Sequence, residues 1–119
     1  MNVLLCEDDE ELRISVAELL ELRGYHVAAV GTLRAASAAV RARAFDVALI
    51  DLDLPDGSGL VLAGEIRAAG HATRLIVTSG DEAASTRSRA RDAGFERFLV
   101  KPVTERQLLA ALENQTETS

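Results

Sequence analysis

The sequence predicts an α/β domain in which a parallel five-stranded sheet carries helices on both faces. Five short apolar runs alternate along the chain with longer segments that have helical character. Regular alternation of strand and helix favours a parallel sheet, because each crossover returns the chain to the same end of the sheet. Polar or charged residues follow each run, which marks the point where the strand leaves the core. The expected strands cover residues 3–6, 25–30, 47–50, 74–78 and 95–100.

The first two expected helices lie between the first three apolar runs. Asp9 opens the first helix, which ends in a left-handed cap at Gly24. Thr32 is a good N-cap for the second helix, over residues 33–44. Spacing of i, i+4, i+7 and i+8 gives the first helix one apolar stripe, with Ile14 on the opposite face. The stripe, which we expect to be buried, consists of Leu12, Val16, Leu19 and Leu20.

Three further helices are expected in the second half of the chain, each begun by a residue with capping chemistry. Glycines close two of them, at Gly70 and Gly94. The expected ranges are 58–69, starting at Ser58 or Gly59; 82–93, with Asp81 as the N-cap; and 105–112, with Thr104 as the N-cap.

Length and composition bound the class of protein. The 119 residues suffice for one domain, and we expect residues 1–115 to form it, with a disordered tail over 116–119 and no output domain in the chain. The net charge of −6 argues against a nucleic-acid partner. A single cysteine, Cys6, cannot form an internal disulfide and is expected to be a small buried side chain. With no membrane-length apolar run and no basic leader, we expect a soluble cytoplasmic protein.

The strongest functional signal is the set of residues at the strand ends. Glu7 and Asp8 follow the first strand, Asp51 follows the third, Ser79 the fourth and Lys101 the fifth. In a parallel sheet all carboxyl ends lie at one edge, where ligands of open α/β sheets bind. Residues far apart in the sequence should therefore meet at a single site.

The chemistry expected at this edge is phosphoryl transfer with a divalent cation. Three carboxylates within a few ångströms repel one another, and hard oxygen ligands suit Mg²⁺. A carboxylate such as Asp51 can attack phosphorus to form an acyl phosphate. Lys101 is the only lysine in the chain, which favours a specific role as a positive charge at the site. The simpler alternative is an acidic rim that only solvates one end of the sheet.

Four motifs stand at strand ends, in this order along the chain: Leu5-Cys6-Glu7-Asp8-Asp9, the run from Ala48 to Gly59, Val77-Thr78-Ser79-Gly80 and Phe98-Leu99-Val100-Lys101-Pro102. Together they resemble the receiver domain of two-component response regulators. The resemblance spans about residues 2–113, and it implies a flavodoxin-like (βα)₅ fold with strand order 2-1-3-4-5.

The resemblance implies a role for each residue at the strand ends. Asp51 would accept a phosphoryl group from a histidine kinase or a histidine phosphotransfer protein. Glu7 and Asp8 would hold Mg²⁺, with Mn²⁺ as an alternative, together with Asp51 and the backbone carbonyl of Asp53. Ser79 would bond a phosphoryl oxygen. The chain would then be a bacterial phosphoprotein that catalyses only its own phosphorylation and dephosphorylation, not a turnover enzyme.

The resemblance also implies a switch and a cis peptide bond. Phe98 occupies the family's switch-aromatic position and would rotate as Ser79 moves. Lys101 would pair with the phosphoryl group, and the Lys101–Pro102 peptide would be cis. Thr78 directly precedes Ser79, so the sequence leaves open which of the two hydroxyls is the switch. Val103 stands where the family usually has phenylalanine after Lys-Pro.

Partners are expected mainly from the resemblance. Kinase-type helices would dock on the first helix and the last βα loop, near Leu12, Pro102 and Val103, and Ile14 could add a contact. The downstream effector is unknown, and the domain would be a monomer or a weak dimer. The chain could be a stand-alone regulator, a relay shuttle, or a piece of a hybrid kinase or larger regulator.

Two other functions fit part of the sequence. A receiver that is never phosphorylated and serves only for docking would keep this fold. A haloacid-dehalogenase-type phosphatase uses an Asp-x-Asp nucleophile with Mg²⁺ and a lysine, and Asp51-Leu52-Asp53 superficially matches that pattern. However, the Gly-Thr that normally follows is replaced by Leu54-Pro55, and the motif lies on the third strand instead of the first.

Overall fold

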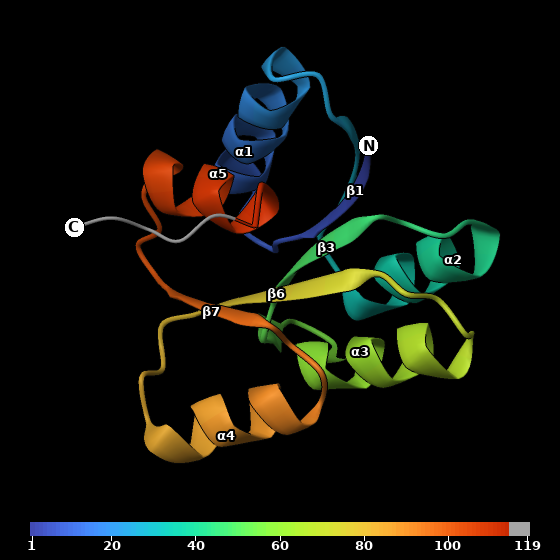
Figure 1. Cartoon of the computed structure of the whole chain (residues 1–119), viewed down its shortest axis with the longest axis vertical. Helices are drawn as coiled ribbons and strands as arrows, with labels where there is room; N and C mark the ends of the chain where they lie inside the picture. The colour runs from blue at the N-terminus through green and yellow to red at the C-terminus, as the bar shows by residue number, and fades with distance from the viewer. Residues whose placement is uncertain (115–119) are drawn as a thin grey trace.

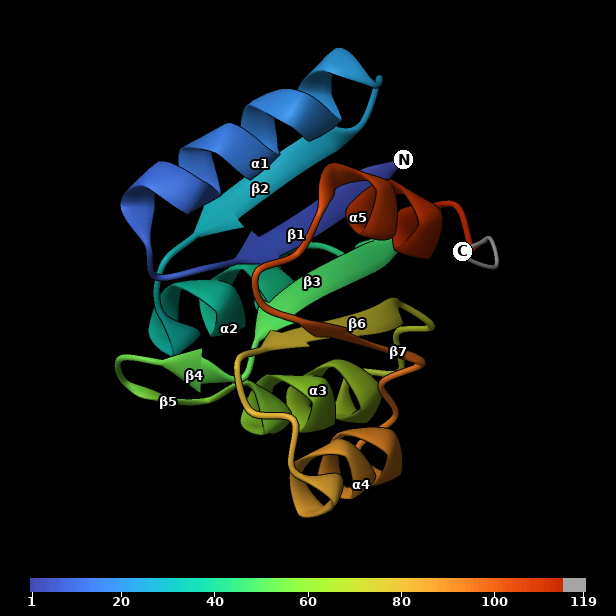
Figure 2. The same cartoon turned by 90° about the vertical axis from the view of Figure 1, so that its left-hand side faces the viewer.

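The computed structural model, which describes residues 1–114, has three layers: two helical layers enclose a central sheet (Figures 1 and 2). Strand β1 pairs in parallel with β2 and with β3, and the sheet continues through β6 to β7 in the order β2-β1-β3-β6-β7. Counted along the main sheet alone, this is the expected order 2-1-3-4-5. The strands are β1 (Asn2–Cys6), β2 (His26–Val30), β3 (Val47–Asp51), β6 (Arg74–Ser79) and β7 (Arg97–Val100).

Helices α1 and α5 cover one face of the sheet, and α2, α3 and α4 cover the other (Figure 2). Because side chains alternate across a strand, neighbouring residues of β3 enter different cores: Leu49 packs with Leu20 and Leu108, and Ile50 packs with the other layer. The helices are α1 (Glu10–Leu22), α2 (Leu33–Ala42), α3 (Gly59–Ala68), α4 (Ala84–Asp92) and α5 (Glu105–Leu112).

Several expected features are present at the helix starts. The side chain of Asp9 accepts a hydrogen bond from the Leu12 N–H, and Thr32 and Thr104 cap α2 and α5 in the same way. Gly24 has a φ of +91° just beyond α1, which is the left-handed conformation expected there. Cys6 is buried, with 1% of its surface exposed.

Other boundaries were predicted wrongly. Helix α4 begins at Ala84, not at residue 82, and its N-cap is Ala83, not Asp81; the Asp81 carboxylate instead accepts bonds from the Ala83 N–H and the Thr86 hydroxyl. Strand β7 begins at Arg97, two residues later than expected, and α2 ends at Ala42. Residues 43–44 and 80–83 are exposed, so no burial pattern marks the end of α2 or the start of α4. Phe95 is buried, but its N–H donates to the Ala90 carbonyl in the turn after α4, so it precedes the strand.

The buried stripe of α1 was also partly wrong. Leu20 is buried and Val16 and Leu19 are half-buried, but Leu12 is 41% exposed because α1 extends past the end of β1 there. Ile14, expected on the outer face, is 49% exposed. A two-stranded antiparallel hairpin, β4 (Asp53–Leu54) and β5 (Gly57–Ser58), was not predicted at all.

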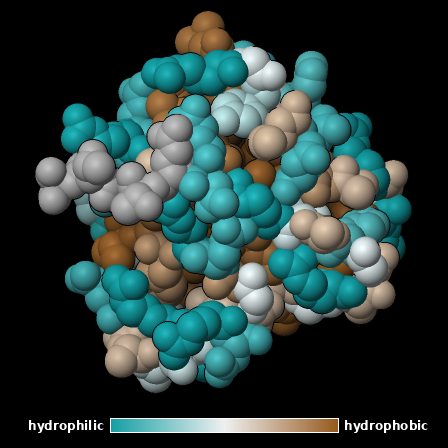
Figure 3. Space-filling model, viewed as in Figure 1, coloured by the Kyte–Doolittle hydropathy of each residue, from teal (hydrophilic) through white to brown (hydrophobic). Residues whose placement is uncertain are grey.

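Polar side chains dominate the face in Figure 3, and apolar atoms show between them only in small separate areas. Within residues 1–114, no helix is both long enough and apolar enough to cross a membrane. The tail expected over residues 116–119 lies outside the described residues, and the boundary expected at residue 115 stays a prediction.

Candidate functional site

Acids, a lysine and a hydroxyl from four strands lie at the carboxyl edge of the sheet. Glu7 and Asp8 directly follow β1, Asp51 and Ser79 are the last residues of β3 and β6, and Lys101 follows β7. The backbone aligns these ends, because Asp51 pairs with Thr78 and the Lys101 N–H donates to the Ser79 carbonyl at 2.8 Å. The parallel topology therefore assembles these residues, as the strand order required.

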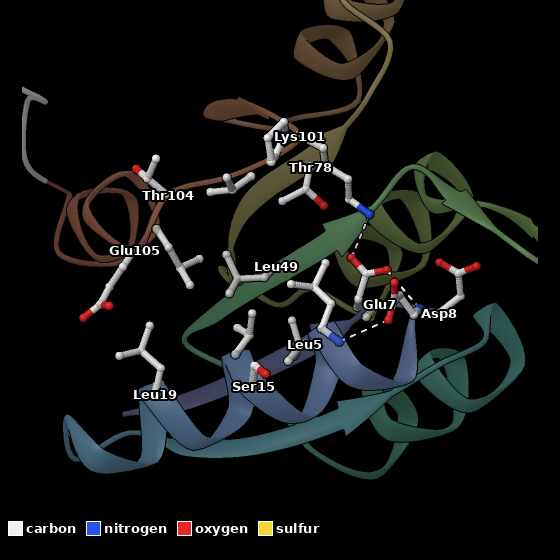
Figure 4. Close-up of a pocket in the computed structure, with 17 residues that line it drawn as sticks. Leu5, Glu7, Asp8, Ser15, Leu19, Leu49, Thr78, Lys101, Thr104 and Glu105 are labelled. Carbon is white, nitrogen blue, oxygen red and sulfur yellow. Dashed lines mark hydrogen bonds and ion pairs between the residues drawn. The ribbon is translucent and has the colours of Figure 1, made fainter.

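Lys101 joins the two buried carboxylates. Its ammonium group lies 2.7 Å from Oε1 of Glu7, a contact marked by a dashed line in Figure 4. It also lies 2.9 Å from Oδ2 of Asp51. Glu7 and Asp51 are 4% and 3% exposed, so the apolar core holds them from behind. The second oxygen of each carboxylate accepts a backbone N–H, from Asp9 for Glu7 and from Asp53 for Asp51.

Burial and ion pairing shift the ionisation of these groups. Burial raises the pKa of Glu7, and its contacts with Lys101 oppose that shift without cancelling it. For Lys101, burial alone would lower the pKa, but the hydrogen bonds and charges of Glu7 and Asp51 outweigh it, so the pKa of Lys101 is raised. Lys101 therefore stays in its ammonium form, and the ionised form of Glu7 is less favourable than that of an exposed glutamate.

The acidic cluster fits a divalent cation. One carboxylate oxygen from each of Glu7, Asp8 and Asp51 lies within 4.8 Å of the others. One ammonium group compensates only part of this charge, and oxygen ligands of this kind suit a hard cation. Asp53 is exposed beside the cluster, and its N–H donates to Oδ1 of Asp51 at 2.9 Å, which orients the Asp51 carboxylate.

Ser79 and Thr78 lie on different sides of β6. The Ser79 hydroxyl is buried, accepts a bond from the Asp81 N–H at 3.0 Å, and lines a cavity of about 400 Å³ with Asp53 and Asp81. Thr78 is half-buried and lines a different groove, beside Lys101. The choice of Ser79 as the switch hydroxyl stays a prediction.

Phe98 is half-buried on the α2–α3–α4 face, next to the end of the sheet that carries the site. The guanidinium group of Arg87, from α4, lies 4.6 Å from the centre of the Phe98 ring. This distance is within the range of a cation–π contact. The aromatic ring is thus held between the core and a charged side chain on the neighbouring helix.

The larger groove, of about 800 Å³, runs from the acidic cluster between α1 and the start of α5. Figure 4 shows Ser15 and Leu19 of α1 on one side and Thr104 and Glu105 on the other. Of the residues expected to dock a partner, Leu12, Pro102 and Val103 line this groove, and Ile14 does not. The Lys101–Pro102 peptide bond is cis, as the resemblance implied.

Sequence reasoning missed three contacts near the site. Arg13 donates to the Glu7 carbonyl at 2.9 Å, and Asp56 binds the first N–H groups of α2. Gly59 lies so close to the site that a Cβ there would be 2.6 Å from the Asp51 carbonyl oxygen. The Gly59 contact could have been suspected from the glycine at a helix start, but the partners of Arg13 and Asp56 leave no local pattern.

The chain matches the family model of the response regulator receiver domain over residues 3–113, and it therefore belongs to this family. It is 33% identical to the swarming motility regulation protein RssB of Serratia marcescens, over 95% of this chain and 52% of that protein. The curated relatives are longer: the chain covers 26% to 63% of those compared. Receiver domains of response regulators act in signalling with sensor kinases and downstream effectors, and are not classical turnover enzymes.

Solved structures agree with this assignment. The non-phosphorylated HemR receiver domain from Leptospira biflexa has a TM-score of 0.88 and 32% identity, over 99% of this chain and 98% of that one. A response regulator from Burkholderia pseudomallei, solved with a phosphorylated aspartic acid, a calcium ion and citrate, has a TM-score of 0.86 and 31% identity, over 93% of this chain and 65% of that one. The flavodoxin-like fold expected from the sequence is confirmed.

Proposed function

We propose that Asp51 accepts a phosphoryl group from the phosphohistidine of a sensor kinase or a phosphotransfer protein, in a Mg²⁺-dependent reaction. The observation that carries the proposal is the shared ammonium group of Lys101, held at 2.7 Å and 2.9 Å from two buried carboxylates beside a third. A docking domain that is never phosphorylated has no need of this costly arrangement.

In the proposed step, one carboxylate oxygen of Asp51 forms a bond to phosphorus while the bond from phosphorus to the histidine nitrogen breaks, and the electron pair leaves with the imidazole. Lys101 would turn from the Asp51 carboxylate to the new phosphoryl oxygens and stabilise their charge. The Ser79 hydroxyl, now an acceptor for the Asp81 N–H, would donate to a phosphoryl oxygen.

The carboxylates of Glu7, Asp8 and Asp51 and the backbone carbonyl of Asp53 would hold the cation, Mg²⁺ or alternatively Mn²⁺. When bound, the ion would supply positive charge that neutralises the transferring phosphoryl group. The similar protein from Burkholderia pseudomallei, which carries a phosphorylated aspartic acid and a calcium ion, supports both the acceptor chemistry and a divalent cation.

We further propose that phosphorylation changes the surface around Ser79 and Phe98, and that the histidine donor docks along the groove near Leu12, Pro102 and Val103. Ile14 does not line this groove, so a partner contact there stays a prediction. The phosphatase alternative has lost its support, because the Asp-x-Asp match lies on the third strand of a receiver domain. The cytoplasmic location, bacterial origin and oligomeric state stay predictions.

The decisive test is labelling with phosphoramidate, followed by intact-protein mass spectrometry. We expect the parent to gain one phosphoryl group when Mg²⁺ is present and none in excess chelator, and Asp51→Asn to gain none. Label that persists in Asp51→Asn, or that ignores Mg²⁺, would contradict the proposal. Repeated turnover of p-nitrophenyl phosphate would instead restore the phosphatase hypothesis.

A further inference from the structure

The loop between β3 and α3 is tied to the site at its base. The Asp53 N–H donates to Oδ1 of Asp51 at 2.9 Å, and Asp53 pairs with Ser58 in the β4–β5 hairpin. Two residue pairs are too few for a hairpin to hold its own shape in water. The position of the Asp53 backbone must therefore depend on other contacts of the loop.

Asp56, at the tip of this loop, supplies such a contact. Its Oδ1 accepts from the Leu33 N–H at 2.6 Å and its Oδ2 accepts from the Arg34 N–H at 2.9 Å. These are the first two residues of α2, more than twenty positions earlier in the chain. Both oxygens of the Asp56 carboxylate thus accept N–H groups from α2, a helix that precedes β3 in the chain.

The helix start and the loop complement each other. Four N–H groups at the start of a helix lack partners within it. In α2 the Thr32 hydroxyl accepts from Ala35 N at 3.1 Å, and no acidic residue lies in the helix's own first turn. Asp56 binds two of the three N–H groups that Thr32 leaves, and it adds the negative charge that the positive end of the helix favours.

The tip of the loop also packs closely against α2. Gly57 has a φ of +156°, and a Cβ at this position would lie 2.7 Å from Cδ2 of Leu33. Bonds from the Arg34 and Leu33 N–H groups lower the pKa of Asp56, which therefore remains a carboxylate in neutral solution. Backbone contact and charge together fasten the tip to α2.

We infer that Asp56 is a positioning residue for the cation site: by fastening the β4–β5 hairpin to the N-terminus of α2, it holds the Asp53 backbone in place beside Asp51. The inference rests on the proposed function, in which the Asp53 carbonyl is a ligand. Asp56 itself does not touch the cation or the phosphoryl group. The effect of Asp56 reaches the site along residues 53–56. Removing its side chain should therefore loosen the site without altering the carboxylates proposed to bind the cation.

The test compares Asp56→Ala with Thr32→Ala in the full chain. Both changes remove a capping interaction from the start of α2, but only Asp56→Ala frees the loop. Mg²⁺ affinity is measured by isothermal titration calorimetry, and the Asp53 amide is followed by NMR. We expect Asp56→Ala to bind Mg²⁺ about tenfold more weakly, as for the loss of other outer-shell contacts, and Thr32→Ala to bind as the parent does.

A second variant covers the case in which Asp56→Ala does not fold. Asp56→Asn keeps one acceptor oxygen, so it should fall between the parent and Asp56→Ala in affinity. Parent-like affinity in the Asp56 variants would overturn the inference, and so would an equal loss in Thr32→Ala, because helix stability alone would then suffice. Those results would leave labelling of the parent intact, whereas a parent that binds no Mg²⁺ would overturn the proposed function as well.

Discussion

Two loops flank Asp51, and they are held very differently. Residues 52–58 follow β3, form a short hairpin, bury Leu52 and Leu54, and bind α2 through Asp56. Residues 80–83 follow β6, are all exposed, and lead into α4 without a side-chain cap on its N-cap residue, Ala83. The bonds of Asp81 are local, to Ala83 and Thr86.

The difference in anchoring suggests that the two loops beside Asp51 have different roles. On the β3 side, the Asp53 backbone, which is proposed to bind the cation, is held by the Asp51 carboxylate and the hairpin before any ligand arrives, and this lowers the cost of binding. On the β6 side, the loop after Ser79 has few anchors, so Ser79 could move without disturbing the core. A switch requires one fixed loop, where the ligand binds, and one looser loop, whose movement can signal binding.

Cys6, the last residue of β1 and paired with Ile50 of β3, tests how closed the core beneath the site is. Burial, and to a smaller extent the charge of Asp51, raises the pKa of Cys6 from 9.0 to about 12, so the thiol stays protonated in the native protein. The stability that the protonated thiol contributes is lost only as pH rises through that range. At pH 8 we expect the thiolate fraction, and hence alkylation by iodoacetamide, to be about 1000-fold lower in the native than in the urea-unfolded protein. Equal rates would mean that this part of the core opens readily.

Lys101 is shared by both sides, and its removal should separate binding from chemistry. We expect Lys101→Met to lower phosphoramidate labelling by about 100-fold, because charge on the phosphoryl group loses its partner. The same change should strengthen Mg²⁺ binding severalfold, since the carboxylates lose their only observed ammonium partner. Labelling and calorimetry measure the two effects, and a loss of both would argue for a general collapse of the site.

Asp81→Ala should loosen the β6 side alone. The carboxylate links the loop to Ala83 and to the buried Thr86, so we expect hydrogen exchange of the amides in residues 82–86 to speed up severalfold. Mg²⁺ affinity should stay that of the parent, in contrast to Asp56→Ala. Weaker Mg²⁺ binding in Asp81→Ala would show that the two loops are coupled.

The smallest effect is expected from Arg87→Gln, which removes the cation from the face of Phe98. A cation–π contact at an exposed site shifts an equilibrium about two- to fivefold, so the ring should leave its half-buried position more often. NMR of the Phe98 ring, with and without phosphorylation, measures the shift. Arg91→Gln, on the same helix, is the control and should leave the ring resonances unchanged.

Strand placement carried most of the successful prediction. Each apolar run ends at the residue where the chain leaves the core, so Glu7, Asp51, Ser79 and Lys101 could be assigned to one edge before any contact was known. Helix caps at Asp9, Thr32 and Thr104 were equally local, since each donor lies within three residues of its acceptor. Interactions of this range leave a pattern in the sequence.

The features that the sequence predicted wrongly depend on contacts that the apolar pattern of the sequence does not record. Asp81 looks like an N-cap, but the turn lets it bind Ala83 and Thr86 and shifts the helix start. Leu12 fits the apolar stripe of α1, yet it is 41% exposed. The β4–β5 hairpin is too short to have its own periodicity.

From residue order alone followed the alternating fold, the edge at which the charges gather, and the identity of the residues there, because burial of apolar runs depends on composition over short distances. Only the tertiary structure showed the two ion pairs of Lys101, the difference in anchoring between residues 52–58 and residues 80–83, and the attachment of Asp56 to α2. These contacts depend on which surfaces meet once the sheet is assembled. No local sequence pattern shows that a carboxylate will bind an N–H group more than twenty residues away.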